Sequence, residues 1–202
     1  MTLNNKPQII LASQSPRRRE LLNQIGITFI IRSVEVDEHP LQGEAAKDYV
    51  ARVAAEKSLA AFNRYDTELD LPVLAADTSV VLDGEIFGKP ADKDDAFRML
   101  MKLSGQCHEV ISAVSLRGKR HWETLSVSSV RFRRLHQQEV SAYWRTGEQQ
   151  DKAGAYAIQG KGALFVSRIE GSYSGIVGLP LNETADLLKD AGIQLWEGIS
   201  ES

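Results

Sequence analysis

Runs of apolar residues separated by polar turns predict a strand, a helix and a second strand at the start of the chain. The apolar stretch 8–12 is typical of a buried strand, and residues 16–25 carry apolar side chains on one helical face. Gly26 follows as a C-terminal stop for that helix. Alternating β-branched and aromatic residues over 28–34 then predict the second strand, which is broken by carboxylates and a proline.

The longest helical stripe covers residues 44–62, with small and apolar side chains on one side and charged side chains mostly opposite. A polar connection over 63–70 separates it from 71–76, which is apolar on both faces and predicts a central strand. We expect that strand to end at Asp77 and Thr78. A carboxylate that emerges from such a strand is unusual.

The second half of the chain contains more antiparallel signals. Asp83 and Gly84 tolerate the positive φ angles of a tight turn, so 80–82 and 85–87 are predicted to pair. The remaining pattern predicts, in order, a helix from an Asp92 cap to 103, paired strands at 107–116 and 122–132, a helix at 137–146, strands at 156–158 and 163–170, and a helix at 181–191.

No internal repeat, low-complexity tract or long linker interrupts this order. Residues 1–202 are therefore expected to form a single domain that mixes strands and helices. The tail after Trp196 is expected to be loose.

The composition fits a soluble globular protein. Of the 202 residues, 43% are hydrophobic and 25% are charged, which is enough for one substantial core or two small lobes. The formal charge of −3 argues against nucleic acid as a partner, because non-specific binding to a polyanion needs a large positive field.

The single cysteine and the start of the chain bear on location. Cys107 cannot form an intramolecular disulfide, and its strand-like segment predicts a buried thiol without chemistry, so we expect a reducing, cytoplasmic location. Residues 1–7 are polar, and the first apolar run is too short for a signal sequence or a membrane span. We expect no contact with a membrane.

The turn after the first strand is the strongest chemical signal. Pro16 suits the first position of a helix, and Ser15 before it can cap that helix. A helix N-terminus beside Ser13, Arg17 and Arg18 attracts anions, which predicts a phosphate site. Because successive helical residues are rotated by about 100°, at most two of the three consecutive arginines can face one ligand.

Other charged residues have two interpretations. Asp77 is either a turn former or a functional carboxylate, which would bind a divalent cation or deprotonate a water. Asp37 and Glu38 are either a polar turn or the source of a second carboxylate for a magnesium site. Lysines such as Lys57 and Lys89 are most often solvated, although the rigid Gly-Lys-Pro setting of Lys89 suits a phosphate contact.

Several known sites are absent from the sequence. The four histidines lack the spacing of a zinc site, and no second cysteine is present. The sequence contains neither a Walker A loop nor a Gly-x-Gly-x-x-Gly motif at the start of a helix, so ATPase and dehydrogenase functions lose their main support.

Short motifs nevertheless follow one another in a specific order. They are Leu-Ala-Ser-Gln-Ser-Pro-Arg-Arg at 11–18 with Glu-Leu-Leu at 20–22, Val-Asp-Glu at 36–38, Glu-Lys at 56–57, Ala-Asp-Thr at 76–78, Gly-Lys-Pro at 88–90, Leu-Ser-Gly at 103–105, Asp-Lys-Ala-Gly-Ala-Tyr at 151–156, Ile-Gln-Gly at 158–160 and Val-Gly-Leu-Pro at 177–180. In this order and spacing the chain resembles the Maf family of nucleoside triphosphate pyrophosphatases, from Ile9 to about Leu188. Gln14, Ser79 and Ser112 are minor departures from the family pattern.

The resemblance implies a fold and a set of partners. The fold would be α/β, a mixed elongated sheet flanked by helices, with two lobes around a cleft as in inosine triphosphate pyrophosphatase. The resemblance also implies a homodimer and a divalent cation, Mg²⁺ or Mn²⁺, with Glu38 and Asp77 as its protein ligands.

Three residues near the expected base, Arg17, Thr78 and Gln159, resemble the dTTP/UTP group of the family, whereas the 7-methyl-GTP group has Trp, Gln and Glu at the matching places. The expected activity is therefore hydrolysis of dTTP, UTP or modified pyrimidine nucleotides to the monophosphate and pyrophosphate, linked to nucleotide pool cleaning and cell division arrest. The alternatives are 7-methyl-GTP hydrolysis and a non-catalytic nucleotide sensor in septum formation.

The resemblance also assigns roles. Asp77 would act as general base, and Glu38 would help to bind the cation or to position water. Phosphate charge would be neutralised by Ser13, Ser15, Arg18, Lys57 and Lys89, and the base would be read by Arg17, Thr78 and Gln159.

Overall fold

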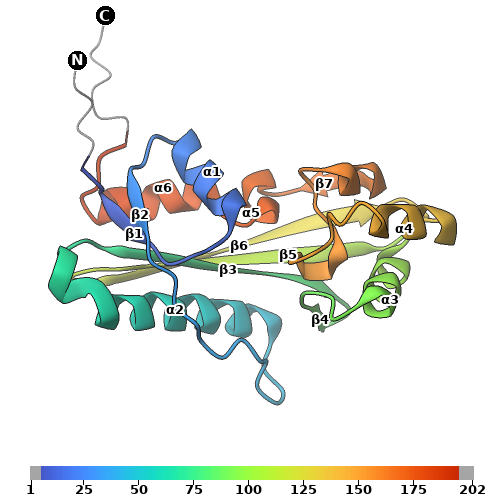
Figure 1. Ribbon diagram of the computed structural model, residues 1–202, viewed down its shortest axis with the longest axis horizontal. Helices are drawn as coiled ribbons and strands as arrows, with labels where there is room; N and C mark the ends of the chain where they lie inside the picture. Colours follow the sequence, from blue (N-terminus) through green and yellow to red (C-terminus); the bar gives the residue numbers. More distant parts are fainter. Residues whose placement is uncertain (1–5, 196–202) are drawn as a thin grey trace, which may run out of the picture.

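A seven-stranded mixed sheet runs through the molecule (Figure 1). The computed structural model describes residues 6–195, with residues 66–68 described by their backbone alone, so the tail after Trp196 lies outside it. The strands are β1 (Ile9–Leu11), β2 (Phe29–Ile31), β3 (Val73–Leu82), β4 (Glu85–Phe87), β5 (Cys107–Arg117), β6 (His121–Phe132) and β7 (Val166–Glu170). The helices are α1 (Pro16–Gln24), α2 (Ala46–Leu69), α3 (Lys93–Leu103), α4 (Gln137–Trp144), α5 (Tyr173–Val177) and α6 (Leu181–Asp190), with short 3₁₀ helices η1 (Ala153–Ala155) and η2 (Lys161–Phe165).

The order of strands is β2-β1-β3-β5-β6-β7, with β4 paired to β3. β1 is parallel to β2 and β3, and the other pairs are antiparallel. Helix α2 covers one face of the sheet, and α1, α5 and α6 cover the other (Figure 1). The expected mixed α/β fold is confirmed.

The helices form two groups along the long strands β3, β5 and β6. α1 and α6 lie near β1 and β2, while α3 and α4 lie together at the other end with β4 and β7 (Figure 1). Among residues 6–195, none of the helices is long and apolar enough to cross a membrane.

The edge of β3 opposite β5 is interrupted at its middle. β5 pairs along β3 from Val73 to Val81, so β1 and β4 must both lie on the other edge. There β1 pairs with Val73 and Leu74, and β4 pairs with residues 80–82. Within the described residues 6–195, no strand therefore lies beside residues 75–79 on this edge, and the sheet has a gap.

Side chains of β3 alternate between two packed layers, as strand geometry requires. Leu74, Ala76 and Val80 belong to the cluster shared with α1 and α3, whereas Ala75 and Val81 pack in clusters with α2. Asp77 therefore faces α2, and its neighbour Thr78 faces α1 and α5. The gap is lined from both faces of the sheet.

Several expected boundaries are wrong for identifiable reasons. The predicted strand 71–76 does not end at Asp77, because β3 continues unbroken to Leu82 in register with β5. The predicted connection 63–70 is helical as far as Leu69, since Tyr65 and Leu69 continue the apolar stripe of α2. The helix stops at Asp70, which has a φ of 43°.

Two expectations fail in the second half of the chain. Residues 156–158 form an irregular buried segment instead of a strand, and 163–170 divides into η2 and β7. The thiol of Cys107 is exposed instead of buried, because Cys107 stands at the first position of β5. In contrast, the Asp83-Gly84 hairpin, the Asp92 cap of α3 and the pairing of β5 with β6 are confirmed.

Candidate functional site

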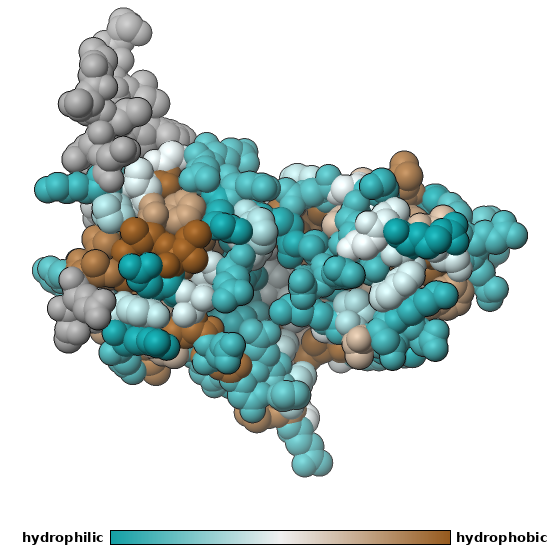
Figure 2. Space-filling view, viewed as in Figure 1, coloured by the Kyte–Doolittle hydropathy of each residue, from teal (hydrophilic) through white to brown (hydrophobic). Residues whose placement is uncertain are grey.

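A cavity of about 990 Å³ opens at the gap in the sheet. In Figure 2, hydrophilic residues surround the hollow in the middle of the visible face. Ten of the residues singled out from the sequence line this cavity: Ser13, Ser15, Arg17, Arg18, Glu38, Lys57, Asp77, Thr78, Lys89 and Gln159. Asp37 does not line it and instead bonds to His39, so Glu38 is the carboxylate that this segment supplies. The ten lining residues come from six separate parts of the chain, which the fold brings together.

Lys57 joins two carboxylates on the α2 face of the sheet. Its Nζ lies 2.8 Å from Oδ1 of Asp77 and 2.9 Å from Oε1 of Glu38. The side chains of Lys57 and Asp77 are only 12% and 11% exposed, whereas that of Glu38 is 45% exposed. The ammonium group thus lies between two carboxylates, one of which is largely buried, and compensates their charge.

Tyr49 fixes the chain that carries Glu38. Its hydroxyl donates to the Glu38 carbonyl at 2.7 Å, and burial beside Asp77 and Glu38 raises the pKa of Tyr49 to about 12. Burial tends to raise the pKa of Glu38, but Lys57, Lys89 and Arg18 outweigh it and lower that pKa overall. The Glu38 carboxylate is therefore held ionised at the cavity.

The turn between β1 and α1 has a different internal bond from the one expected. Ser15 occupies the N-cap position of α1, but its side chain makes no capping hydrogen bond. Instead, its backbone N–H donates to Oγ of Ser13 at 3.2 Å. The predicted capping by Ser15 is wrong, and the Ser15 hydroxyl is left for a ligand of the cavity.

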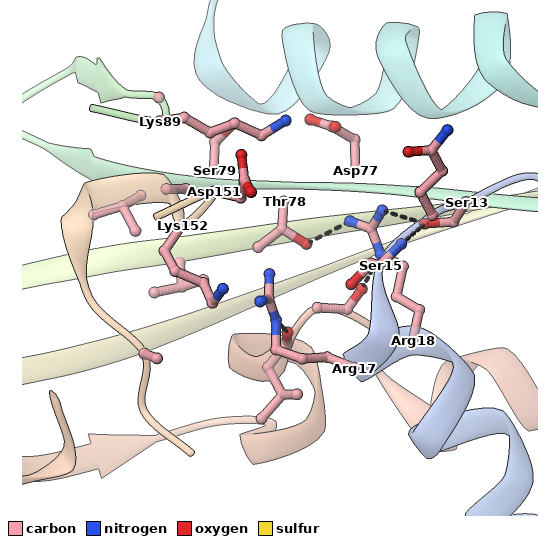
Figure 3. A pocket seen from close by; sticks show the side chains of 18 of the residues that line it. Ser13, Ser15, Arg17, Arg18, Asp77, Thr78, Ser79, Lys89, Asp151 and Lys152 are labelled. Carbon is pink, nitrogen blue, oxygen red and sulfur yellow. Dashed lines mark hydrogen bonds between the residues drawn. The ribbon is translucent and has the colours of Figure 1, made fainter. Parts of the chain in front are cut away.

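Arg18 is held by the protein on the opposite side of β3 from Asp77 (Figure 3). Its guanidinium donates to the Gly178 carbonyl at 2.9 Å and to the hydroxyls of Ser13 and Thr78, both at 3.3 Å. Burial lowers the pKa of Arg18, and the nearby Asp77 carboxylate offsets only part of that effect. Such a buried cation favours an anionic ligand.

Arg17 occupies the outer part of the same wall. Its Nε donates to the Val177 carbonyl at 3.3 Å, and burial lowers its pKa although Asp151 and Glu20 act against this. Figure 3 shows the Lys152 side chain approaching Arg17, and burial together with Arg17 lowers the pKa of Lys152.

The segment that carries Gln159 is held by Glu148. The Glu148 carboxylate accepts from the backbone N–H groups of Lys161 at 2.9 Å and Gly162 at 3.0 Å, and from the Tyr143 hydroxyl at 2.9 Å. The same hydroxyl accepts from the N–H of Ala157 at 3.0 Å. Gln159, which is exposed to the cavity, therefore lies between two anchored positions.

One glycine lets this segment approach β3 closely. Gly154 has a φ of 68°, and a Cβ at this position would lie 2.9 Å from a methyl group of Val80. Its N–H donates to the carbonyl of Gly88, the residue before Lys89, at 3.1 Å. The two loops that border the cavity are thus joined directly.

The sequence does not point to four residues that line or support the cavity. Tyr49 falls within the apolar stripe of the helix predicted over 44–62, and Ser112, which bonds to Thr78 without lining the cavity, is only a minor departure from the family pattern. Lys152 belongs to a motif without an assigned role. Glu148 carries no signal, because a lone glutamate after a glycine resembles any solvated turn residue.

The cavity has a nearly balanced charge. Five cationic side chains, Arg17, Arg18, Lys57, Lys89 and Lys152, face four carboxylates, Glu38, Asp77, Glu148 and Asp151. Within residues 6–195, no group of three or more His, Cys, Asp or Glu side chains is assembled for a metal ion. Glu38 and Asp77 nevertheless converge on one cation, Lys57 Nζ, and Mg²⁺ is commonly held by one or two carboxylates together with substrate phosphates. The donor set fits such an ion.

Comparison with known proteins identifies relatives along nearly the whole chain. The family model described as Maf-like protein matches residues 8–191. A protein of Methylococcus capsulatus named dTTP/UTP pyrophosphatase is 59% identical over 187 residues, which cover 92% of each chain. A protein with the same name from Hahella chejuensis is 52% identical, and the match covers 94% of each chain. Another from Anaeromyxobacter dehalogenans is 53% identical, and the match covers 95% of this chain and 98% of its own.

Solved structures with some similarity are more distant. The Staphylococcus aureus Ham1 protein has a TM-score of 0.44 and 18% identity, over 61% of this chain and 71% of its own. A Mycobacterium abscessus dITP/XTP pyrophosphatase has a TM-score of 0.42 and 14% identity, over 91% and 94%.

Proposed function

Because the chain belongs to the Maf family, we propose that it is a nucleoside triphosphate pyrophosphatase that hydrolyses dTTP and UTP to the monophosphate and pyrophosphate. The observation that carries this proposal is the Glu38–Lys57–Asp77 arrangement beside a cation-lined cavity. This arrangement supports the proposal because it orients a carboxylate beside cations that a polyanionic substrate would bind.

Hydrolysis needs a water to attack the α-phosphorus and a group to remove its proton. Lys57 bonds to Oδ1 of Asp77, which orients this carboxylate to accept the proton. As the new P–O bond forms, the bond from the α-phosphorus to the bridging oxygen breaks, and pyrophosphate leaves with the electron pair. The monophosphate keeps the oxygen supplied by water.

The cations of the cavity have a separate duty. Negative charge on the phosphates repels a hydroxide-like nucleophile, and positioned donors reduce that repulsion most strongly in the transition state. We assign this role to Lys57, Lys89 and Arg18, with the hydroxyls of Ser13 and Ser15. Arg17, Thr78 and Gln159 are assigned to the base.

A divalent cation is the expected cofactor. Glu38 and Asp77 would hold Mg²⁺ or Mn²⁺ together with substrate phosphates. Such an ion would supply positive charge and polarise a phosphoryl oxygen. The near balance of fixed charges in the cavity supports this proposal, because five cations against four carboxylates leave little net charge for a triphosphate.

The test is a substrate panel. Purified protein is incubated with magnesium and with dTTP, UTP, dCTP, GTP or 7-methyl-GTP, and the products are identified. Pyrophosphate with the monophosphate is expected from dTTP and UTP. Orthophosphate with a diphosphate would contradict the proposed reaction. Preferred hydrolysis of 7-methyl-GTP would assign the chain to the 7-methyl-GTP group of the family. Binding of dTTP without turnover would favour the non-catalytic nucleotide sensor.

We also propose a homodimer that works in the cytoplasm and binds neither membranes nor nucleic acid. The support is the family resemblance, together with the formal charge of −3 for the last point. Light scattering of the purified protein should give twice the 22.4 kDa chain mass. A monomer mass at micromolar concentration would contradict the dimer.

A further inference from the structure

A chain of hydrogen bonds crosses from the cavity wall into the protein interior. Arg18 Nη2 donates to Oγ1 of Thr78 at 3.3 Å, and Thr78 Oγ1 lies 2.8 Å from Oγ of Ser112 on the adjacent strand β5. Ser112 Oγ in turn donates to the Gly175 carbonyl of α5 at 2.7 Å. Figure 3 shows the Arg18 end of this chain.

The direction of every bond in this chain is fixed by proton counting. A carbonyl oxygen can only accept, so the single hydroxyl proton of Ser112 goes to Gly175. The Thr78 hydroxyl must then donate its own proton to Ser112. A guanidinium can only donate, so the Thr78 oxygen accepts from Arg18. Thr78 has no proton left to offer and faces the cavity solely as an acceptor.

Burial makes this arrangement stable. Ser112 is 1% exposed, and turning its proton toward Thr78 would leave the Gly175 carbonyl without this bond. Leaving a buried polar group unpaired is costly, so the alternative proton order is disfavoured. The direction of the hydroxyl protons in this chain is therefore set by Ser112 and the Gly175 carbonyl, which lie behind Thr78 and away from the cavity.

We propose that Ser112 is a positioning residue for base selection, because it turns Thr78 into an obligatory hydrogen-bond acceptor that favours a ring N–H and rejects a ring nitrogen lone pair. This inference rests on the proposed function and on Thr78 facing the base. Thymine and uracil carry a hydrogen on N3 between two carbonyls, whereas N3 of cytosine is an acceptor. Arg17 on the same wall supplies donors for a carbonyl. Cytosine would place its N3 lone pair against that of Thr78.

The test compares dTTP with dCTP in matched variants. Ser112→Ala frees the Thr78 proton to turn toward the base, and the ratio of kcat/KM for dCTP to that for dTTP is expected to rise about tenfold, the effect of one hydrogen bond of about 1.4 kcal/mol. Ser112→Thr keeps a hydroxyl and should keep the wild-type ratio. Ser112→Cys, whose thiol is a weak acceptor, should change the ratio in the same direction as Ser112→Ala and serves if the alanine variant does not fold.

Ser128→Ala is the matched control. Ser128 is also 1% exposed and also donates to a carbonyl at the start of α5, that of Ser172 at 3.2 Å, but it does not contact Thr78. The proposal would be overturned if Ser128→Ala raised the dCTP-to-dTTP ratio of kcat/KM as much as Ser112→Ala does. It would also be overturned if neither Ser112→Ala nor Ser112→Cys changed that ratio.

Binding separates this inference from the proposed reaction. The affinities of the α,β-imido analogues of dUTP and dCTP, which resist hydrolysis between these phosphates, are measured by calorimetry with the same variants. A shift in their affinity ratio in Ser112→Ala supports the inference even if the wild-type protein hydrolyses nothing, a result that would refute only the proposed function. An unchanged affinity ratio overturns the inference.

Discussion

Single residues in this cavity have their protonation and direction set by neighbours on other elements. Asp77 illustrates the limits of the sequence: its type and place after an apolar run indicated a functional carboxylate, but the expected strand end was wrong. The partner strand β5 continues past Asp77, and no local pattern reveals that pairing. What made Asp77 accessible is the absence of a strand on the other edge of β3, which depends on where β1 and β4 stop.

Asp77→Asn should reduce kcat by about 10²- to 10⁴-fold, because an amide cannot take the proton of the attacking water. The steady-state rate with dTTP measures this effect. Asp83→Asn is the control, since Asp83 is exposed at the hairpin turn and asparagine tolerates its φ of 52°. Turnover by a folded Asp77→Asn protein within threefold of the wild type would exclude Asp77 as the base.

Lys57→Met removes the cation that joins Glu38 to Asp77. The two carboxylates would then lose the cation that lies between them, and their mutual repulsion, only partly offset by Lys89 and Arg18, would favour protonation of one of them. We expect a large loss of kcat and a shift of its pH profile toward higher pH. Lys47→Met, an exposed position on the same helix, should change neither quantity. An unshifted profile in Lys57→Met would contradict this role of the ammonium group.

At the scale of elements, hydrophobic periodicity predicted the helices and long strands well, and failed where tertiary contacts override it. The 63–69 segment is helical because Tyr65 and Leu69 pack beside Ala61, four and eight residues further along one face. Residues 156–158 are apolar enough for a strand, yet they are held by the Tyr143 hydroxyl instead of a sheet. Long-range bonds of this kind have no local signature.

Glu148→Gln should loosen the segment that presents Gln159. The amide nitrogen that replaces one carboxylate oxygen cannot accept, so either a Lys161 or a Gly162 N–H loses its partner, at a cost of about 1–3 kcal/mol in the free energy of unfolding. We expect a raised KM for dTTP with a smaller change in kcat. Thermal unfolding and steady-state kinetics measure both effects, with the exposed Glu109→Gln as control. An unchanged KM would show that Glu148 does not position this wall.

For the whole molecule, stability should fall in acid in two stages. His108 is buried, and its Nε2 shares a hydrogen bond of 2.9 Å with the Tyr156 hydroxyl. Burial lowers the pKa of His108 to about 4. The unfolded chain binds this proton near pH 6.5, so the stabilising effect of neutral His108, roughly 3 kcal/mol, is lost as the pH falls from 6.5 to 4.

The second stage involves Glu44 and Glu139, each paired with an arginine that lowers its pKa to about 2. Their contribution is present above pH 4.5 and is lost as the pH falls toward 2. Urea unfolding across this range measures both stages. His108→Gln should remove the first stage only, and His39→Gln, at an exposed position, should remove neither. A first stage that persists in His108→Gln would assign it to another group.

The gap on the edge of β3 has a consequence for how such a protein can diversify. Asp77 and Thr78 are sequence neighbours, yet one projects toward α2 and the other toward α5, with the strand between them. Under the proposed roles, substitutions at Arg17 or Thr78 on the α5 side alter which base is accepted without contacting Glu38, Lys57 or Asp77 on the α2 side, whereas Arg18 on the α5 side also serves the phosphates. The backbone of a single strand thus stands between the residues assigned to the base and the carboxylates assigned to hydrolysis, so a change of base preference does not require a change in those carboxylates.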